Sequence, residues 1–242
     1  MAQTVAGSVT SLTGDVRIQR AGTTVAATPG TAVDVSDRLI TGPNSRVTVT
    51  LTDNSRIELD ESTSLVIDQQ MATTASRDTK LSLFTGLVRS FVSYTSAPTP
   101  NFAVHTPNAV ASARGTEYDT STTTQVPGSF SQEDKEKYKD CRRFTRVAVF
   151  DGTVEVINST NPGGGSVQVP AGHKTWVACG FAPFPPSELG VVAATGLAEG
   201  SDWGLFIGGT IVVGGVFGGL AAAGAFGGGN NNHHKHPNTS GE

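Results

Sequence analysis

The sequence is poor in charged residues and in cysteine. Only 16% of its 242 residues are charged, against about 25% in a typical soluble protein. Lysine and arginine total 17 against 21 aspartate and glutamate, for a net charge of -4, which argues against a nucleic-acid binder with a basic surface. The composition also excludes a long coiled coil. Two cysteines are too few for a disulfide scaffold and form no zinc set.

The sequence also lacks the common catalytic motifs. There is no Gly-x-Ser-x-Gly elbow, no His-Glu-x-x-His and no pair of carboxylates that the pattern places in one pocket. His105 and His173 are isolated and are interpreted as structural. The tail histidines 233, 234 and 236 could bind a metal ion, but the neighbouring asparagines favour a disordered tail. We therefore predict a protein that is not an enzyme, with no cofactor and no metal.

What is present is a pattern of short β-strands. Apolar and polar residues alternate in several runs, which places one face of each strand on a core and the other in water. The apolar positions are Val47, Val49, Leu51, Ile57, Leu59, Leu65, Ile67, Leu81 and Leu83. Turn residues recur at roughly the 8–12-residue spacing of an all-β sandwich, barrel or solenoid. We predict one all-β domain of stacked short antiparallel strands, sandwich or solenoid-like, over residues 1–179.

Several motifs in this domain resemble those of a known family. Residues 102–109 and 113–118 resemble the "V-x-T-P-x-A … R-G-T-x-F" signature of the FecR domain, with Tyr118 in place of the usual Phe. Other family-like segments lie in the same order over residues 5–177, including a Gly-Asp-Val near the start and an Asp-Gly hairpin at residues 151–152. The fixed positions of the signature are Thr106, Pro107, Arg114, Gly115 and Thr116. Within it, Arg-Gly-Thr could bind a ligand, but we favour a structural role in which glycine supplies a backbone position.

The resemblance implies an extracytoplasmic all-β domain. In the best-known members, this domain is the outer part of a transmembrane anti-sigma regulator that senses an outer-membrane iron-siderophore receptor. The sequence shows neither a helical sigma-binding domain before the β domain nor a separate lobe after it for a receptor. We therefore expect only the domain type to carry over.

A charged insertion interrupts the β pattern at residues 129–146. Ser131 is expected to cap a short helix with acidic residues in its first turn and lysines late. The insertion is either a partner-binding protrusion, formed by Glu133, Lys135, Lys137 and Tyr138, or a solvated loop without a partner, which is the commoner case. Cys141 and Cys179 either form a disulfide that ties the insertion to the last strand or are two unrelated buried thiols.

The remainder of the chain changes character. Residues 180–202 are predicted to be a Pro/Gly linker and residues 227–242 a disordered polar tail. Between them, residues 203–226 are predicted to form a transmembrane helix. Its residues 205–226 are 22 residues without a charge, which span about 33 Å as a helix, enough for a hydrocarbon core of about 30 Å. Glycines spaced by four would let such helices pack closely: Gly204, Gly208, Gly214, Gly215, Gly218 and Gly219. The alternative is a flexible Gly-rich segment or a buried hairpin.

These patterns leave three functional hypotheses. The first is a non-enzymatic binding protein of the bacterial envelope, anchored by its C-terminus, with the tail that carries Lys235 in the cytoplasm and the β domain outside. Its ligand would be an envelope protein, a cell-wall polymer or a glycan, and not a nucleic acid. The second is a structural protein that self-associates into an oligomer or filament. The third is a transmembrane signalling component of the anti-sigma type. Export would require a signal peptide, of which Ala2-Gln3 would be the processed remnant.

Overall fold

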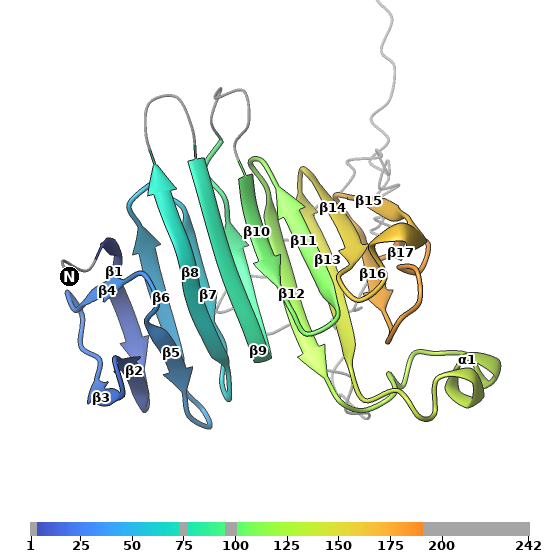
Figure 1. The fold of residues 1–242 in the computed structure, drawn as a ribbon, viewed down its shortest axis with the longest axis horizontal. Coiled ribbons are helices and arrows are strands. Elements are labelled where there is room, and N and C mark those ends of the chain that lie inside the picture. The colour runs from blue at the N-terminus through green and yellow to red at the C-terminus, as the bar shows by residue number, and fades with distance from the viewer. Residues whose placement is uncertain (1–3, 73–76, 95–100, 191–242) are drawn as a thin grey trace, which may run out of the picture. The chain divides into compact units, whose positions relative to one another are not determined.

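The computed structural model describes residues 4–72, 77–94 and 101–190 (Figure 1). The chain divides into two units, Met1–Asp202 and Trp203–Glu242, and every described residue belongs to the first. The predicted transmembrane helix and polar tail lie outside the described residues. Neither of the two short helices within the described ranges has the length and apolar character needed to span a bilayer.

The described residues are mostly β-strand, which confirms the predicted all-β class, and the strands form two layers (Figure 1). Sheet A contains, in spatial order, β4 (Ala32–Asp34), β1 (Val5–Thr13), β6 (Arg46–Leu51), β7 (Arg56–Leu59), β9 (Arg77–Phe91), β12 (Glu117–Thr123), β13 (Phe144–Asp151), β16 (His173–Val177) and β17 (Ser187–Glu188). Sheet B contains β3 (Thr23–Ala26), β2 (Val16–Arg20), β5 (Arg38–Thr41), β8 (Ser64–Ala72), β9, β10 (Asn101–His105), β11 (Ala109–Ala113), β14 (Thr153–Asn158) and β15 (Ser166–Pro170).

Strand β9 belongs to both sheets. Its first part pairs with β8 and β10 in sheet B, and its second part pairs with β7 and β12 in sheet A. The change occurs at Gly86, whose φ of 90° is a conformation that residues with a side chain rarely adopt. The β9–β10 pair is parallel, and every other pair in the described ranges is antiparallel.

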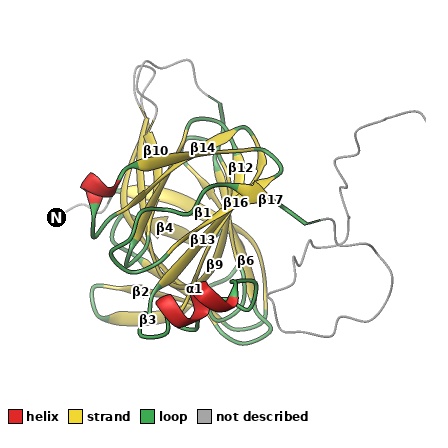
Figure 2. Ribbon diagram, turned by 90° about the vertical axis from the view of Figure 1, so that its right-hand side faces the viewer, coloured by secondary structure: helices red, strands yellow, loops and turns green. Residues whose placement is uncertain are grey.

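The inward side chains of both sheets form one hydrophobic core. It includes the whole predicted alternation, from Val47 to Leu83, and each of those nine side chains is buried. Period-two patterning therefore identified the inner face of four strands correctly, because side chains of a strand alternate between its two faces. The two helices of the described ranges, α1 (Gln132–Lys137) and a 3-10 turn (Pro162–Gly164), contribute no residue to this core. Figure 2 shows the helices in red and the strands in yellow.

Candidate functional site

The charged insertion is an ordered loop between β12 and β13, which we call the lobe (residues 124–143). Its helix α1 begins as predicted, because the Ser131 hydroxyl accepts a hydrogen bond from the Asp134 N–H at 3.0 Å. No residue of α1 is buried, and a helix this short is not stable alone in water. The order of α1 must therefore come from contacts made by the rest of the lobe.

A small aromatic core, separate from the core of the two sheets, holds the lobe in place. Phe130 is at its centre. The Phe130 ring centroid lies 6.0 Å from that of Tyr138, 5.9 Å from Phe144, 5.8 Å from Trp176 and 4.9 Å from Phe184. Three of the four contacts are edge-to-face, an arrangement that aromatic rings favour. The lobe therefore packs on β13, on β16 and on the chain that follows β16.

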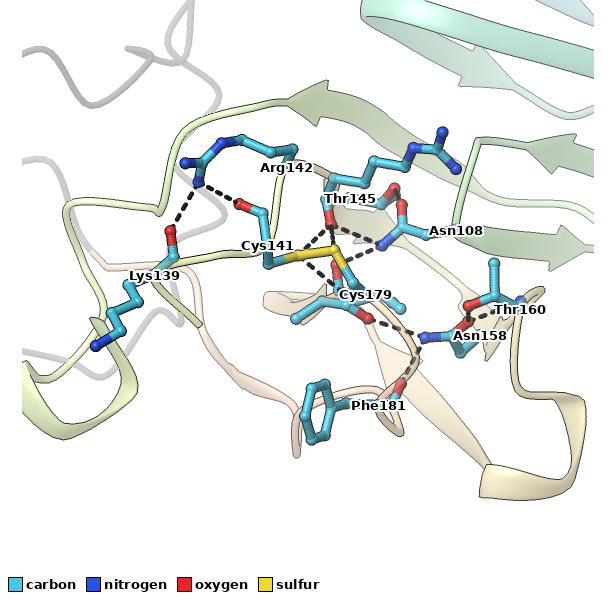
Figure 3. The surroundings of a disulfide bond; sticks show 12 residues. Asn108, Lys139, Cys141, Arg142, Thr145, Asn158, Thr160, Cys179 and Phe181 are labelled. Carbon is cyan, nitrogen blue, oxygen red and sulfur yellow. Dashed lines mark hydrogen bonds between the residues drawn. A yellow bond between two sulfur atoms is a disulfide. The ribbon is translucent and has the colours of Figure 1, made fainter. Parts of the chain in front are cut away.

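A disulfide between Cys141 and Cys179 closes the base of the lobe (Figure 3). This is the paired arrangement of the two that the sequence left open. The two cysteines are 38 residues apart, and closing a loop of that length stabilises a fold by about 3–4 kcal/mol in the chain-entropy model. The Cys179 N–H also donates to Cys141 Sγ at 3.1 Å. The Arg142 guanidinium donates to the backbone oxygens of Lys139 and Cys141, at 2.7 and 3.2 Å.

The four residues proposed for partner contact are not equivalent. Glu133 and Lys137 are exposed and Lys135 is half-buried. Tyr138 differs from the expectation: it is only 5% exposed, because its ring belongs to the aromatic core, so its main role is to support the lobe. The Lys137 ammonium lies over two rings, 5.0 Å from the Tyr138 centroid and 5.3 Å from that of Phe181. Phe181, which is 45% exposed, had no pattern to mark it because it follows the last predicted strand.

The Thr-Pro element of the signature forms the turn between β10 and β11. The Thr106 hydroxyl accepts a hydrogen bond from the Ala109 N–H at 2.9 Å, which closes the turn around Pro107. It also lies 2.7 Å from the hydroxyl of Thr145 on β13. This part of the signature therefore connects a turn of sheet B with a strand of sheet A, and its role is structural.

Asn108, in the same turn, was not singled out by the sequence. It is 1% exposed, and its amide donates to the backbone oxygens of Arg143 at 3.1 Å and Val177 at 2.8 Å (Figure 3). Its side-chain oxygen accepts a hydrogen bond from the Thr145 hydroxyl at 2.7 Å. Asn108 therefore joins the turn to the start of β13 and the end of β16, at the base of the lobe. Only its position inside the signature could have indicated such a role.

The outer face of sheet A carries a partly buried ion pair that the sequence did not reveal. Arg89 on β9 makes two hydrogen bonds to Asp119 on β12, at 2.7 and 3.0 Å, and its guanidinium lies 4.4 Å from the Phe150 ring centroid. Burial raises the pKa of the Asp119 carboxyl, and the hydrogen bond from Arg89 reduces that rise. Both charges are satisfied by each other, so the pair stabilises the sheet and offers no free group to a ligand.

The described residues contain no cluster of three or more histidine, cysteine, aspartate or glutamate side chains that could hold a metal ion. His105 lies on β10, where burial lowers the pKa of its imidazole. The lobe combines an aromatic core, a disulfide and exposed charges, and it is the candidate site.

Comparison with known proteins identifies the domain. The model of the family described as "FecR protein" matches residues 37–155. Residues 37–155 are a FecR domain. The matched residues lie inside the stretch 5–177 that the motifs indicated, and they include the whole signature and the lobe. No curated protein matches the chain.

Two crystal structures, both of a protein from Parabacteroides distasonis described as an anti-sigma factor, resemble the FecR chain. They were determined at 2.50 and 1.65 Å resolution, and each is 16% identical in sequence, with TM-scores of 0.45 and 0.44. The similarity covers 62% of this chain and 59% of that protein, so this chain spans about three fifths of its length.

The Arg-Gly-Thr element of the FecR signature lies at a crowded position. Gly115 has a φ of 155°, and a Cβ added there would lie 2.9 Å from a ring atom of Tyr94. Thr116 is buried, and a Cβ added to Gly152 would lie 2.6 Å from its methyl group. The crowding favours the structural interpretation for Gly115 and Thr116. Arg114 is exposed next to them.

Tyr118, which replaces the usual phenylalanine of FecR domains, is fully buried on β12. It is directly opposite Ser90 on β9, and among the described residues neither hydroxyl has a hydrogen-bond partner of good geometry. Burial raises the pKa of the Tyr118 phenol, and the nearby Ser90 hydroxyl reduces that rise. The extra hydroxyl therefore has no evident structural benefit, since a buried polar group without a partner is unfavourable.

Replacing Tyr118 by phenylalanine should leave the stability of the domain unchanged or raise it. The substitution removes a buried hydroxyl and keeps the ring, so we expect the free energy of unfolding to rise by up to about 1 kcal/mol. Urea denaturation of Tyr118→Phe and of Ser90→Ala would measure it. A loss above about 1 kcal/mol in both variants would show instead that the two hydroxyls form a stabilising hydrogen bond.

Proposed function

We propose that the protein is a signalling component of the bacterial envelope, whose FecR domain binds a protein partner outside the cytoplasmic membrane and catalyses no reaction. The match of residues 37–155 to the FecR family supports the regulatory role. The observation that carries the binding role is the lobe: a disulfide and an aromatic core fix a helix that contributes nothing to either core. Fixing an exposed charged surface in advance lowers the entropy lost when a partner binds it.

The disulfide supports the placement outside the cytoplasm. Disulfides persist in oxidising compartments such as the bacterial periplasm and are rare in the cytosol, where thiols are kept reduced. Cys141 and Cys179 are the only cysteines of the chain and both are used in this bond. The chain therefore has the cysteine chemistry of an exported protein.

Thiol trapping in the producing cells would test this placement. Cells are quenched with acid, and free thiols are alkylated with a polyethylene-glycol maleimide before and after reduction. We expect no mass shift before reduction and a double shift afterwards, with Cys141→Ser as the control that shows one thiol throughout. A double shift before reduction would place the domain in a reducing compartment and overturn this part of the proposal.

Site-specific cross-linking would test the lobe as the partner surface. A photoreactive amino acid at Glu133 or Lys137 should give one discrete adduct in the native host, because both side chains are exposed on the lobe. Arg17, whose side chain is 57% exposed on sheet B, is the matched control position and should give none. The adduct from Glu133 should be lost in Lys137→Glu and kept in Arg17→Glu. Equal adducts from both surfaces, or none from the lobe, would contradict the assignment, and a glycan adduct would show a different class of ligand.

We further propose that residues 203–226 anchor the protein in the membrane. Their length and their lack of charge meet the requirements of a membrane-spanning helix. The full chain should sediment with membranes, and the chain that ends at residue 202 should stay in the supernatant. The control is extraction with high salt, which should not release the full chain, because a spanning helix is held by hydrophobic contact. Equal solubility of both forms would contradict the anchor.

Self-association through strand edges is the less supported alternative. The edge strands of sheet A, β4 and β17, have three and two residues, and β15 at an edge of sheet B ends at Pro170. Short edges and proline limit edge-to-edge pairing. Light scattering of the detergent-solubilised chain should therefore give a monomer or small oligomer, and a large assembly would favour the structural alternative.

A further inference from the structure

The chain that follows β16 does not leave the domain directly. Residues 180–189, which we call the exit segment, turn back along β16. The Phe184 N–H donates to the Trp176 oxygen at 2.9 Å, and the Thr175 hydroxyl donates to the Phe184 oxygen at 2.6 Å. Further on, β17 pairs with the start of β16, and the Leu189 N–H donates to the Gly172 oxygen at 2.8 Å. The first part of the predicted linker is therefore held on the domain along its length.

The other side of the exit segment faces the lobe. The Phe181 ring lies 5.0 Å from that of Tyr138, edge-to-face, and the Phe184 ring lies 4.9 Å from Phe130 and 5.5 Å from Tyr138. The Lys137 ammonium adds a contact 5.3 Å from the Phe181 ring. Among the described residues, every ring–ring contact between the two parts joins Phe181 or Phe184 to Phe130 or Tyr138.

The composition of the exit segment explains why it needs these contacts. It reads Gly-Phe-Ala-Pro-Phe-Pro-Pro-Ser-Glu-Leu, with prolines at 183, 185 and 186. Proline has no N–H, so a continuous ladder of backbone hydrogen bonds with β16 is not available. Extended proline-rich peptides are instead bound by aromatic side chains, which contact a backbone that is already extended and loses little entropy on binding. The lobe supplies those aromatic side chains.

We propose that the lobe is a clasp: a binding site for the chain's own proline- and phenylalanine-rich exit segment, which fixes the place where the chain leaves the FecR domain. The disulfide at Cys179 lies directly before the segment. A released segment would thus remain covalently attached beside its site, and its high effective concentration would favour rebinding. Opening the clasp would free ten residues, which lengthens the connection to the rest of the chain by up to about 33 Å at ~3.3 Å per residue.

Amide hydrogen exchange on the full chain, followed by mass spectrometry, tests the clasp. Phe184→Ala removes a side chain of the ligand, and Tyr138→Ala removes a side chain of the site. Both should speed exchange at the Phe184 and Leu189 amides by about tenfold or more, while the amides of Val147 and Val149 in β13 keep their rates. The matched control is Phe84→Ala, which removes a ring that is 49% exposed on sheet B and should leave the exit segment protected.

Two results would overturn the clasp. One is unchanged protection of the exit segment in Phe184→Ala and in Tyr138→Ala. The other is equal acceleration of exchange in β13, which would make the segment an inseparable part of the β domain. If either alanine variant fails to fold, the same exchange measurement is made on Phe184→Leu and Tyr138→Leu, which remove the ring but keep a large apolar side chain. The measurement needs no partner, so its failure and a failure of the cross-linking experiment are distinguishable.

Discussion

Replacing Gly86 by alanine should lower the free energy of unfolding of the FecR domain by about 4 kcal/mol, at the upper end of single-substitution effects. Gly86 has a φ of 90°, and an added Cβ would lie 2.2 Å from the Thr63 hydroxyl oxygen and 2.6 Å from the Thr63 Cα. Thr63 cannot easily move away. Its N–H donates to the Thr41 hydroxyl at 2.9 Å, and its own hydroxyl accepts the Leu87 N–H at 3.1 Å.

Gly22→Ala is the matched control for this prediction. Gly22 has nearly the same φ, 84°, but an added Cβ there would meet no atom within 4 Å. Gly22→Ala should lower the free energy of unfolding only by the cost of the unfavourable backbone conformation, about 1 kcal/mol. Urea denaturation of both variants separates backbone strain from steric conflict. Equal losses in the two variants would contradict the view that close packing at the crossing of β9 decides the effect.

The importance of Gly86 follows from the path of β9. The glycine lies where one strand passes from sheet B to sheet A. Before it β9 pairs with β8, and from it onward β9 pairs with β12 and β7. A strand that changes sheets must bend sharply, and glycine permits the bend without a side-chain conflict. The sequence alone showed a run of alternating residues with a glycine in it and could not show the change of sheet.

Most of what could be predicted of the fold came from local periodicity, which indicates the strands and their buried faces. Leu65 and Ile67, and Leu81 and Leu83, are buried as expected, because alternation depends only on the geometry of the strand itself. The FecR signature and the cap of α1 by Ser131 could also be predicted, since each is a short pattern of neighbouring residues. The arrangement of the seventeen strands of the described residues, in two layers joined by β9, could not be predicted, because pairing is decided by contacts between distant segments.

The packing of the lobe could not be predicted from the sequence either. A charged run predicts a solvated surface, which holds for Glu133 and Lys137, but Tyr138 in the same run is buried. Its partners Phe130 and Phe184 lie in segments that were interpreted as an insertion and a linker, 54 residues apart by their numbers. Aromatic residues scattered at this distance form no period, so only the tertiary structure brings them into one core.

Replacing Asn108 by alanine should lower the free energy of unfolding by about 3–4 kcal/mol, because it leaves the buried Val177 oxygen, the part-buried Arg143 oxygen and the Thr145 hydroxyl with fewer partners. The control is Asn161→Ala. Asn161 is exposed and donates a single side-chain hydrogen bond, to the Gly180 oxygen at 3.1 Å, so its loss should cost less than about 1 kcal/mol. Thermal and urea denaturation would measure both, and similar losses would contradict the special role of the buried amide.

Asn108→Asp provides a sharper test of the same hydrogen bonds. The side chain keeps its size, but an ionised carboxylate has no proton to donate, and it would face the Arg143 and Val177 oxygens at close range. A protonated carboxyl can still donate one of the two bonds. The stability of the variant relative to the native chain should therefore be lost as the pH rises from about 4 to 8, in line with the preference of buried carboxyls for the neutral form. A loss that does not change with pH would show that the amide acts through shape alone and not through donation to the ends of β13 and β16.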